Sequence, residues 1–189
     1  MKELTFKQLA IDVATLQGDC LALECSPDES PIPDFENRVR IIAPGILSSL
    51  ILDTPPEDFS DPKKLSSDIS IDENGTVTLK LPEDFLKLVS IRMSDWKRSV
   101  TQPVVTGQLD HSLQSSRFAA LRGNPERPVV MKGFDNAGNR CLRLFTSSRD
   151  ATLAEGLYMA SPDISGDSIS IPEGLYHQLV ARLAESIKP

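Results

Sequence analysis

Alternating apolar and polar residues predict two β-hairpins in the middle of the chain. The first has an alternating stretch on each side of Asn74-Gly75, a dipeptide that favours the tight turn between paired strands. The second joins residues 129–132 to residues 140–145 across a turn at residues 135–139. Because alternate side chains of a strand point to one face, we expect the first hairpin to bury one apolar row. That row comprises Ile69, Ile71, Val77, Leu79 and Leu81.

Apolar residues at helical spacing predict helices toward both ends of the chain. The first runs from Thr5 to Leu16, where Thr5 and Gln8 have the spacing of a capping box. The second begins near Asp34, and Pro44 within it predicts a kink or a restart. Two more are expected over residues 112–122 and 173–187. The expected buried stripes, in chain order, are Phe6, Leu9, Ala10 and Val13; Phe35, Val39, Ile42, Ile46 and Leu50; Leu113, Phe118 and Leu121; and Tyr176, Val180, Leu183 and Ile187.

The segment between the hairpins has a distinctive order of residues. A strand ends at Leu81-Pro82, because proline cannot donate to a strand ladder. We expect residues 83–87 to form a turn or short helix, and residues 89–93 to form a third strand that leads to Trp96. A similar opening, Ile171-Pro172-Glu173, comes directly before the last predicted helix. Residues 156–160 predict a further strand.

This order of elements predicts an α+β fold in which an N-terminal helix pair and a C-terminal helix surround a small antiparallel β region of hairpins. The 189 residues suit a single domain. Within it we expect a helical part at residues 1–53, a proline-rich linker at 54–67 and a β-rich part with the closing helix at 68–189.

The charge is unevenly distributed along the chain. Residues 1–75 hold 6 Lys or Arg and 15 Asp or Glu, a net charge of −9, whereas residues 76–189 hold 14 and 12, a net charge of +2. The acidic part repels phosphates, which argues against nucleic acid as its partner. A basic protein surface fits it better, although an acidic surface that contacts only solvent is the more common case. The three cysteines, Cys20, Cys25 and Cys141, have no disulfide framework, so we expect reduced thiols. We expect neither a signal peptide nor a membrane-spanning segment.

The sequence predicts no catalytic, cofactor-binding or metal-binding residues, and we expect no enzyme. Asp110, His111 and Ser112 are the residue types of a hydrolase triad, but adjacent side chains diverge and cannot form one. A polar loop that caps the next helix explains them better. The glycines are scattered rather than grouped in a phosphate-binding loop. His111 and His177 are far apart, and the cysteines lack the spacing of a zinc site.

Two groups of basic residues are the candidate interface. In the first, Arg92, Lys97 and Arg98 flank Trp96. This group is a candidate because Trp and Arg are frequent in binding hot spots. Trp96 is either an interface anchor or a core residue at a strand end. In the second group, Arg117, Arg122 and Arg127 surround Gly123-Asn124-Pro125. This group could contact the acidic N-terminal half of another copy, and a head-to-tail contact of that kind closes into a ring when the rotation allows.

The order of segments resembles the head–tail connector proteins of tailed bacteriophages, which are also called adaptor, portal-associated ring or tail accessory proteins. The likeness spans most of the chain. It rests on the two N-terminal helices, Leu81-Pro82-Glu83-Asp84-Phe85-Leu86-Lys87-Leu88-Val89 with the following Trp96, Gly123-Asn124-Pro125 before a strand pair, and the apolar C-terminal helix. Members of that family are often more helical, so the two hairpins depart from it.

The resemblance implies a structural virion protein that forms a homo-oligomeric ring and joins the portal protein at the capsid vertex to the tail. Its partners would be other copies, the portal and other tail or connector proteins. DNA would only pass through the lumen, no membrane would be involved, and no cofactor would be needed. The protein would lie at the portal–tail junction of the virion, and in the host cytoplasm during assembly. The alternative is a small non-catalytic binding or assembly-chaperone module of bacterial or prophage origin.

Overall fold

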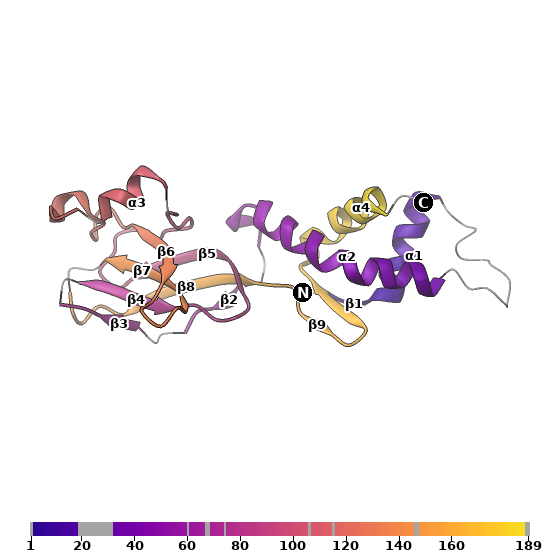
Figure 1. Cartoon of the computed structure of the whole chain (residues 1–189), viewed down its shortest axis with the longest axis horizontal. Helices are drawn as coiled ribbons and strands as arrows, with labels where there is room; N and C mark the ends of the chain where they lie inside the picture. The colour runs from indigo at the N-terminus through magenta and orange to yellow at the C-terminus, as the bar shows by residue number, and fades with distance from the viewer. Residues whose placement is uncertain are drawn as a thin grey trace. The chain divides into compact units, whose positions relative to one another are not determined.

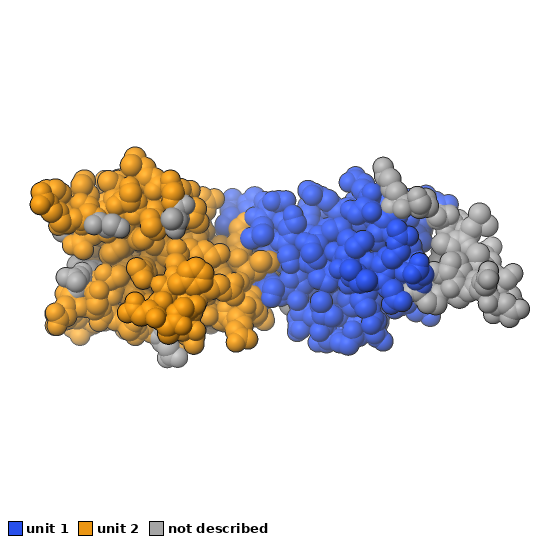
Figure 2. Space-filling view, in the orientation of Figure 1, with its two compact units in different colours: residues 1–61, 160–189 blue, residues 62–159 orange. Residues whose placement is uncertain are grey.

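The computed structural model divides into two compact units, which are residues 1–61 with 160–189 (unit 1) and residues 62–159 (unit 2) (Figure 2). The residues that it describes are 2–18, 32–59, 61–66, 69–73, 75–105, 107–114, 116–145 and 148–187. Cys20, Cys25 and Asn74 lie outside them. Both units combine helices with antiparallel strands, so the α+β class is confirmed.

Unit 1 packs three helices with a small sheet (Figure 1). The helices are α1 (Phe6–Gln17), α2 (Ile32–Asp53) and α4 (Tyr176–Ser186), and two short 3₁₀ turns are η2 (Pro56–Asp58) and η4 (Glu173–Leu175). The sheet has the order β1 (Lys2–Thr5), β10 (Ser168–Ile171) and β9 (Ile164–Ser165). Strand β1 is absent from the sequence prediction. It exists because its residues pair with β10, from the far end of the chain.

Helix α1 follows the sequence prediction closely. The Oγ1 of Thr5 accepts a 3.2 Å hydrogen bond from the N–H of Gln8, and Gly18 ends the helix in the left-handed region at φ 73°. The predicted apolar face is buried throughout. Gln17, in the last turn, donates to the carbonyls of Ala184 (2.7 Å) and Ile187 (3.0 Å), and thereby satisfies free groups at the end of α4.

Helix α2 differs from the prediction in two ways. It is one continuous helix through Pro44, so of the two predicted alternatives, a kink or a restart, the restart is excluded. Its buried side is also rotated from the predicted stripe, because Ile42 and Ile46 are only half-buried while Ala43 and Leu47 are fully buried. In α4 the helix proper begins three residues later than predicted, after η4, and Tyr176 is half-buried.

Unit 2 contains two sheets (Figure 1). One has the order β3 (Ile69–Ile71), β4 (Thr76–Lys80), β7 (Arg140–Phe145) and β6 (Val130–Phe134), and the other has the order β2 (Lys63–Lys64), β8 (Leu153–Ala160) and β5 (Phe85–Met93). Both predicted hairpins are confirmed, with Ile69 opposite Leu79 and Gly133 opposite Cys141. Val77, Leu79 and Leu81 of the predicted apolar row are buried, whereas Ile69 and Ile71 are half-buried.

Proline begins the same local turn at two places in the chain. The N–H of Phe85 bonds the carbonyl of Pro82 (3.1 Å), and the N–H of Leu175 bonds the carbonyl of Pro172 (2.9 Å). After Pro172 the chain enters η4 and then a helix. After Pro82 it enters β5 directly at Phe85, so the turn or short helix predicted over residues 83–87 is limited to a turn at Glu83 and Asp84.

The helix predicted over residues 112–122 is wrong. The chain forms a short helix α3 (Leu109–Gln114) and a 3₁₀ turn η3 (Ala119–Leu121) instead. Phe118 and Leu121, which were expected to face inward, are 58% and 49% exposed. This segment has few apolar positions, and Gly123 and Pro125 close behind it leave too short a stretch for a stable amphipathic helix.

Candidate functional site

Trp96 belongs to the core of unit 2. Its side chain is 3% exposed, and its indole N–H donates a 2.7 Å hydrogen bond to the carbonyl of Phe145 at the end of β7. A buried indole needs such a partner, because an unpaired N–H inside a protein is costly. Of the two alternatives for Trp96, this burial supports a core residue rather than an interface anchor.

The basic residues next to Trp96 differ in how they are paired. Lys97 forms a 2.7 Å ion pair with Glu126, and the Nε of Arg92 lies 3.9 Å from a carboxylate oxygen of Glu155. The Lys97–Glu126 pair is largely exposed to solvent, so it contributes little to stability, whereas the Arg92–Glu155 pair is long and only partly exposed. Arg98 forms no ion pair with any residue that the structure describes.

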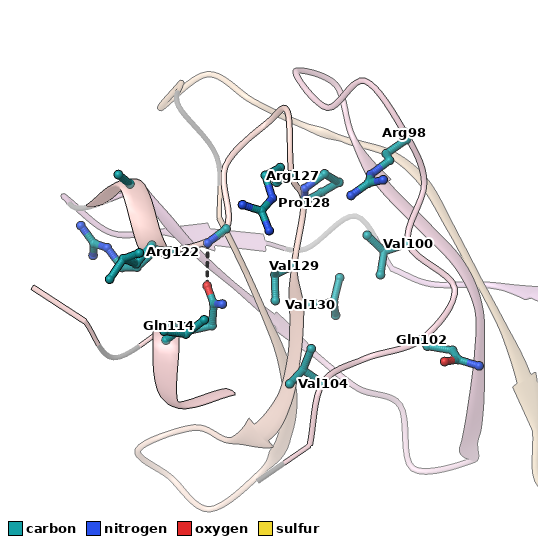
Figure 3. Close-up of a pocket in the computed structure, with 14 residues that line it drawn as sticks. Arg98, Val100, Gln102, Val104, Gln114, Arg122, Arg127, Pro128, Val129 and Val130 are labelled. Atoms are coloured by element: carbon teal, nitrogen blue, oxygen red, sulfur yellow. Dashed lines mark hydrogen bonds between the residues drawn. The ribbon is translucent and has the colours of Figure 1, made fainter. Parts of the chain in front are cut away.

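A hollow of about 270 Å³ in unit 2 brings together three of the predicted residues, Arg98, Arg122 and Arg127. Figure 3 shows Arg98 and Arg127 toward one end of this hollow and Val104 at the other. Between them lies an apolar wall that comprises Val100, Val129 and Val130. The described lining residues come from three segments, 98–104, 113–114 and 120–130, and are up to 32 positions apart in the sequence. We call this site the arginine hollow.

Close packing around Gly123 shapes one side of the arginine hollow. A Cβ at this position would lie 2.9 Å from the Cβ of Val129 and 3.2 Å from a ring carbon of Phe145, so only glycine fits. The N–H of Gly123 donates a 2.6 Å hydrogen bond to the buried side-chain oxygen of Gln114, which ties α3 to this turn (Figure 3). These two contacts fix the backbone that carries Arg122.

The turn that follows is held by Asn124. Its side-chain oxygen accepts 3.0 Å hydrogen bonds from the N–H groups of both Glu126 and Arg127, as in an Asx turn. The opposite side of the hollow is a chain segment between the two sheets. Val100 exchanges hydrogen bonds of 2.9 Å with Ile91 of β5, and the N–H of Val104 bonds the carbonyl of Val130 (2.7 Å). Hydrogen bonds from backbone N–H groups thus hold both walls of the hollow in place.

Among the described residues, the arginine hollow has positive charge without an opposing negative charge. No described lining residue is a carboxylate, and neither Arg122 nor Arg127 forms an ion pair within that part of the chain. Arg117, the remaining predicted residue, lies outside the hollow and stacks at 4.9 Å on the exposed ring of Phe118. Large exposed apolar side chains also occur along this segment, namely Val105, Leu109, Phe118 and Leu121. Unpaired arginines beside exposed apolar groups are typical of a protein–protein contact surface.

Charged groups hold the loop at Pro82, and their contacts stabilise the loop rather than form a reactive site. Asp84 accepts hydrogen bonds from the Nζ of Lys63 (2.8 Å) and the hydroxyl of Tyr158 (2.9 Å). The hydrogen bond from Lys63 lowers the pKa of Asp84, whereas burial and Asp84 raise the pKa of Tyr158 to about 12. Arg140 donates to the carbonyls of Glu83 (2.8 Å) and Phe85 (3.3 Å). Each group is thus engaged in fixing the loop.

Other chemistry is poorly supported by the described residues. Among them there is no group of three or more His, Cys, Asp or Glu side chains that could hold a metal ion. Cys141 is buried in β7 and free, and burial raises the pKa of its thiol, which keeps it in the unreactive protonated form. No helix in the described ranges is both long and apolar enough to cross a membrane.

Comparison with models of protein families and with curated proteins found no match for this chain. The sequence predicted part of the arginine hollow, because Arg98, Arg122 and Arg127 were already candidate interface residues. Its apolar wall and Gln114 were missed. No signal in the sequence indicated that residues 98–104 and 122–130 would meet, because the hydrogen bonds of Val104 to β6 that join them are tertiary contacts.

Proposed function

We propose that this protein is a non-catalytic structural component of a tailed-phage particle, a ring or adaptor protein that joins the portal at the capsid vertex to the tail. It acts by contact with other copies, with the portal protein and with further tail or connector proteins. DNA passes through the lumen without being bound. The protein occupies the portal–tail junction of the virion, and the host cytoplasm before assembly.

The observation that carries this proposal is the arginine hollow of unit 2. Three arginines that form no ion pair among the described residues lie near several exposed apolar side chains, and this combination is typical of a surface that docks a protein partner. The order of segments that resembles head–tail connectors supports the more specific role. The acidic residues 1–75 supply a surface of opposite charge on the same chain, as head-to-tail assembly requires.

The test is the mass of the purified chain by light scattering, alone and mixed with the portal protein of its own genome. We expect a ring-sized species or co-elution with the portal. Because the surfaces carry charge, we also expect the assembly to weaken as salt rises from about 50 mM to 500 mM, where screening becomes strong. A chain that stays monomeric and ignores the portal at every salt concentration would overturn the proposal and favour a small binding or assembly-chaperone module.

A further inference from the structure

The sequence Pro-Glu-Asp-Phe occurs twice in the chain, at residues 82–85 of unit 2 and at residues 56–59 of unit 1. A tight turn lies at each copy, but it begins at the first residue of the copy at 82–85 and one residue earlier, at Pro55, for the copy at 56–59. The N–H of Phe85 bonds the carbonyl of Pro82 in the first, and the N–H of Asp58 bonds the carbonyl of Pro55 (3.2 Å) in the second. The two copies differ in what surrounds them, and this difference indicates a role for the second.

The copy at residues 82–85 shows how this protein binds such a turn. Its aspartate accepts from a lysine and a tyrosine, Lys63 and Tyr158. Its phenylalanine is buried and stacks on Tyr158, with ring centroids 5.6 Å apart. Arg140 holds the backbone carbonyls of the turn. Cationic groups thus bind the polar atoms of the turn, and an aromatic side chain next to them packs against its phenylalanine.

The copy at residues 56–59 has its acidic groups in solvent. Glu57 and Asp58 are exposed, as is the nearby Asp53, and none of the three forms an ion pair with a described residue. A turn that presents two adjacent unpaired carboxylates has the charge that a cationic site would bind. Its 3₁₀ geometry holds both carboxylates on one short segment, which lowers the conformational entropy lost on binding.

The arginine hollow has the complementary chemistry. Arg98, Arg122 and Arg127 supply positive charge, no described lining residue is a carboxylate, and valines supply an apolar wall. Small-molecule sites usually enclose about 300–1,000 Å³. At about 270 Å³ the hollow is smaller than that range and suits a few side chains of a peptide turn.

We propose that the turn at residues 55–59 of one copy docks into the arginine hollow of a second copy. Glu57 and Asp58 pair there with arginines that form no ion pair with a described residue of their own chain. Donor and receptor surfaces are different, so the contact is heterologous and repeats from copy to copy. This inference deepens the proposed function and rests on it, because it names the contact that would join neighbouring copies of a ring.

A labelled peptide of residues 52–61 tests the contact without any need for ring formation. Its binding to the full chain is measured by fluorescence anisotropy at low salt. We expect Arg98→Glu with Arg127→Glu to weaken binding about tenfold or more, since two favourable charge contacts become repulsive. A peptide with Glu57→Gln and Asp58→Asn should weaken similarly. Arg182→Glu, an exposed change on α4, is the matched control and should leave binding unchanged.

Self-association of the full chain supplies the second measurement, by sedimentation velocity over a range of protein concentrations. The double variant Glu57→Arg, Asp58→Arg should not self-associate. Association should return when this variant is mixed with the Arg98→Glu, Arg127→Glu variant, because opposite charges then meet again at each contact. Glu73→Arg, which changes an exposed acid in a hairpin loop of unit 2, is the control. Rings or portal complexes that persist in both charge variants would overturn this inference and leave the proposed function standing. Peptide binding that the arginine changes do not affect would overturn it as well.

Discussion

The indole N–H of Trp96 lies 2.7 Å from the carbonyl oxygen of Phe145 and joins the turn after β5 to the end of β7. We expect Trp96→Phe to lower the free energy of unfolding by about 1–3 kcal/mol, because it leaves this buried carbonyl without its donor. Urea denaturation followed by circular dichroism measures the change. As Trp96 is the only tryptophan, its fluorescence provides an independent check.

That fluorescence should be blue-shifted and poorly quenched by iodide, both in the isolated chain and in any assembly, because the ring is buried within unit 2. Emission typical of water-exposed indole, or quenching that falls sharply on assembly, would contradict the core position. The interface alternative for Trp96 would then return.

Gly123 is expected to tolerate no larger residue. In Gly123→Ala the new Cβ meets the Cβ of Val129 at 2.9 Å, and neither atom is the end of a flexible side chain. Overpacking of this kind costs about 1–3 kcal/mol. Gly133→Ala is the matched control, since nothing lies within 4 Å of a Cβ there. Thermal unfolding of both variants makes the comparison, and equal midpoints would contradict the packing around the hollow.

Asp84 should make stability depend on acid pH. Its pKa is lowered in the folded chain, chiefly by the hydrogen bond from Lys63, so its contribution is present above the unfolded pKa of about 3.9 and is lost as the pH falls through the folded value. We expect Asp84→Asn to cost about 1 kcal/mol at pH 7, a modest value because the pair is partly exposed.

Below about pH 4 the difference between Asp84→Asn and the parent chain should shrink, because protonation removes the same charge from the parent. Urea midpoints at pH 7 and at successively lower pH values measure this convergence. A constant difference over the whole range would show that the Asp84 carboxylate contributes nothing as a charge.

Both tyrosines should ionise at a higher pH than an unperturbed tyrosine. Burial and Asp84 raise the pKa of Tyr158 to about 12, and the hydrogen bond to Asp12 raises the pKa of Tyr176 to about 12. Absorbance at 295 nm should therefore indicate about one-tenth ionisation at pH 11 in the folded chain, against half ionisation near pH 10 in urea. Because the unfolded chain loses these protons first, stability should fall as the pH rises above about 10.

Tyr158→Phe and Tyr176→Phe assign the titration, since each variant retains one tyrosine. Each should halve the absorbance change without moving the midpoint of the other residue. A residue that titrates near pH 10 in the folded chain would lack the hydrogen bond described for it.

Local signals in the sequence were sufficient for the hairpins and for α1. The alternation around Gly75 and the pair Thr5 and Gln8 act between close neighbours, so their structural outcome depends little on the rest of the chain. The helix predicted over residues 112–122 was wrong because no comparable local signal supported it. Its apolar residues had no local partner, and Phe118 and Leu121 remain exposed.

Parts of the candidate site could be predicted because arginines near Gly123 and Trp96 are visible in the sequence. That Arg98 joins Arg122 and Arg127 at one hollow could not, since it depends on the backbone bonds of Val104 to Val130 and Lys132 of β6. The burial of Trp96 likewise depends on Phe145, which lies 49 residues further along the chain.

The sequence by itself determined the α+β class, the two hairpins, the capped first helix and the uneven charge, because periodicity, turn residues and composition act over short distances. Only the tertiary structure decided the pairing of β1 with β10, the continuity of α2 through Pro44 and the assembly of the arginine hollow. Those features follow from contacts between segments far apart in the chain. Their free energy comes from packing and hydrogen bonds that no short stretch of sequence contains.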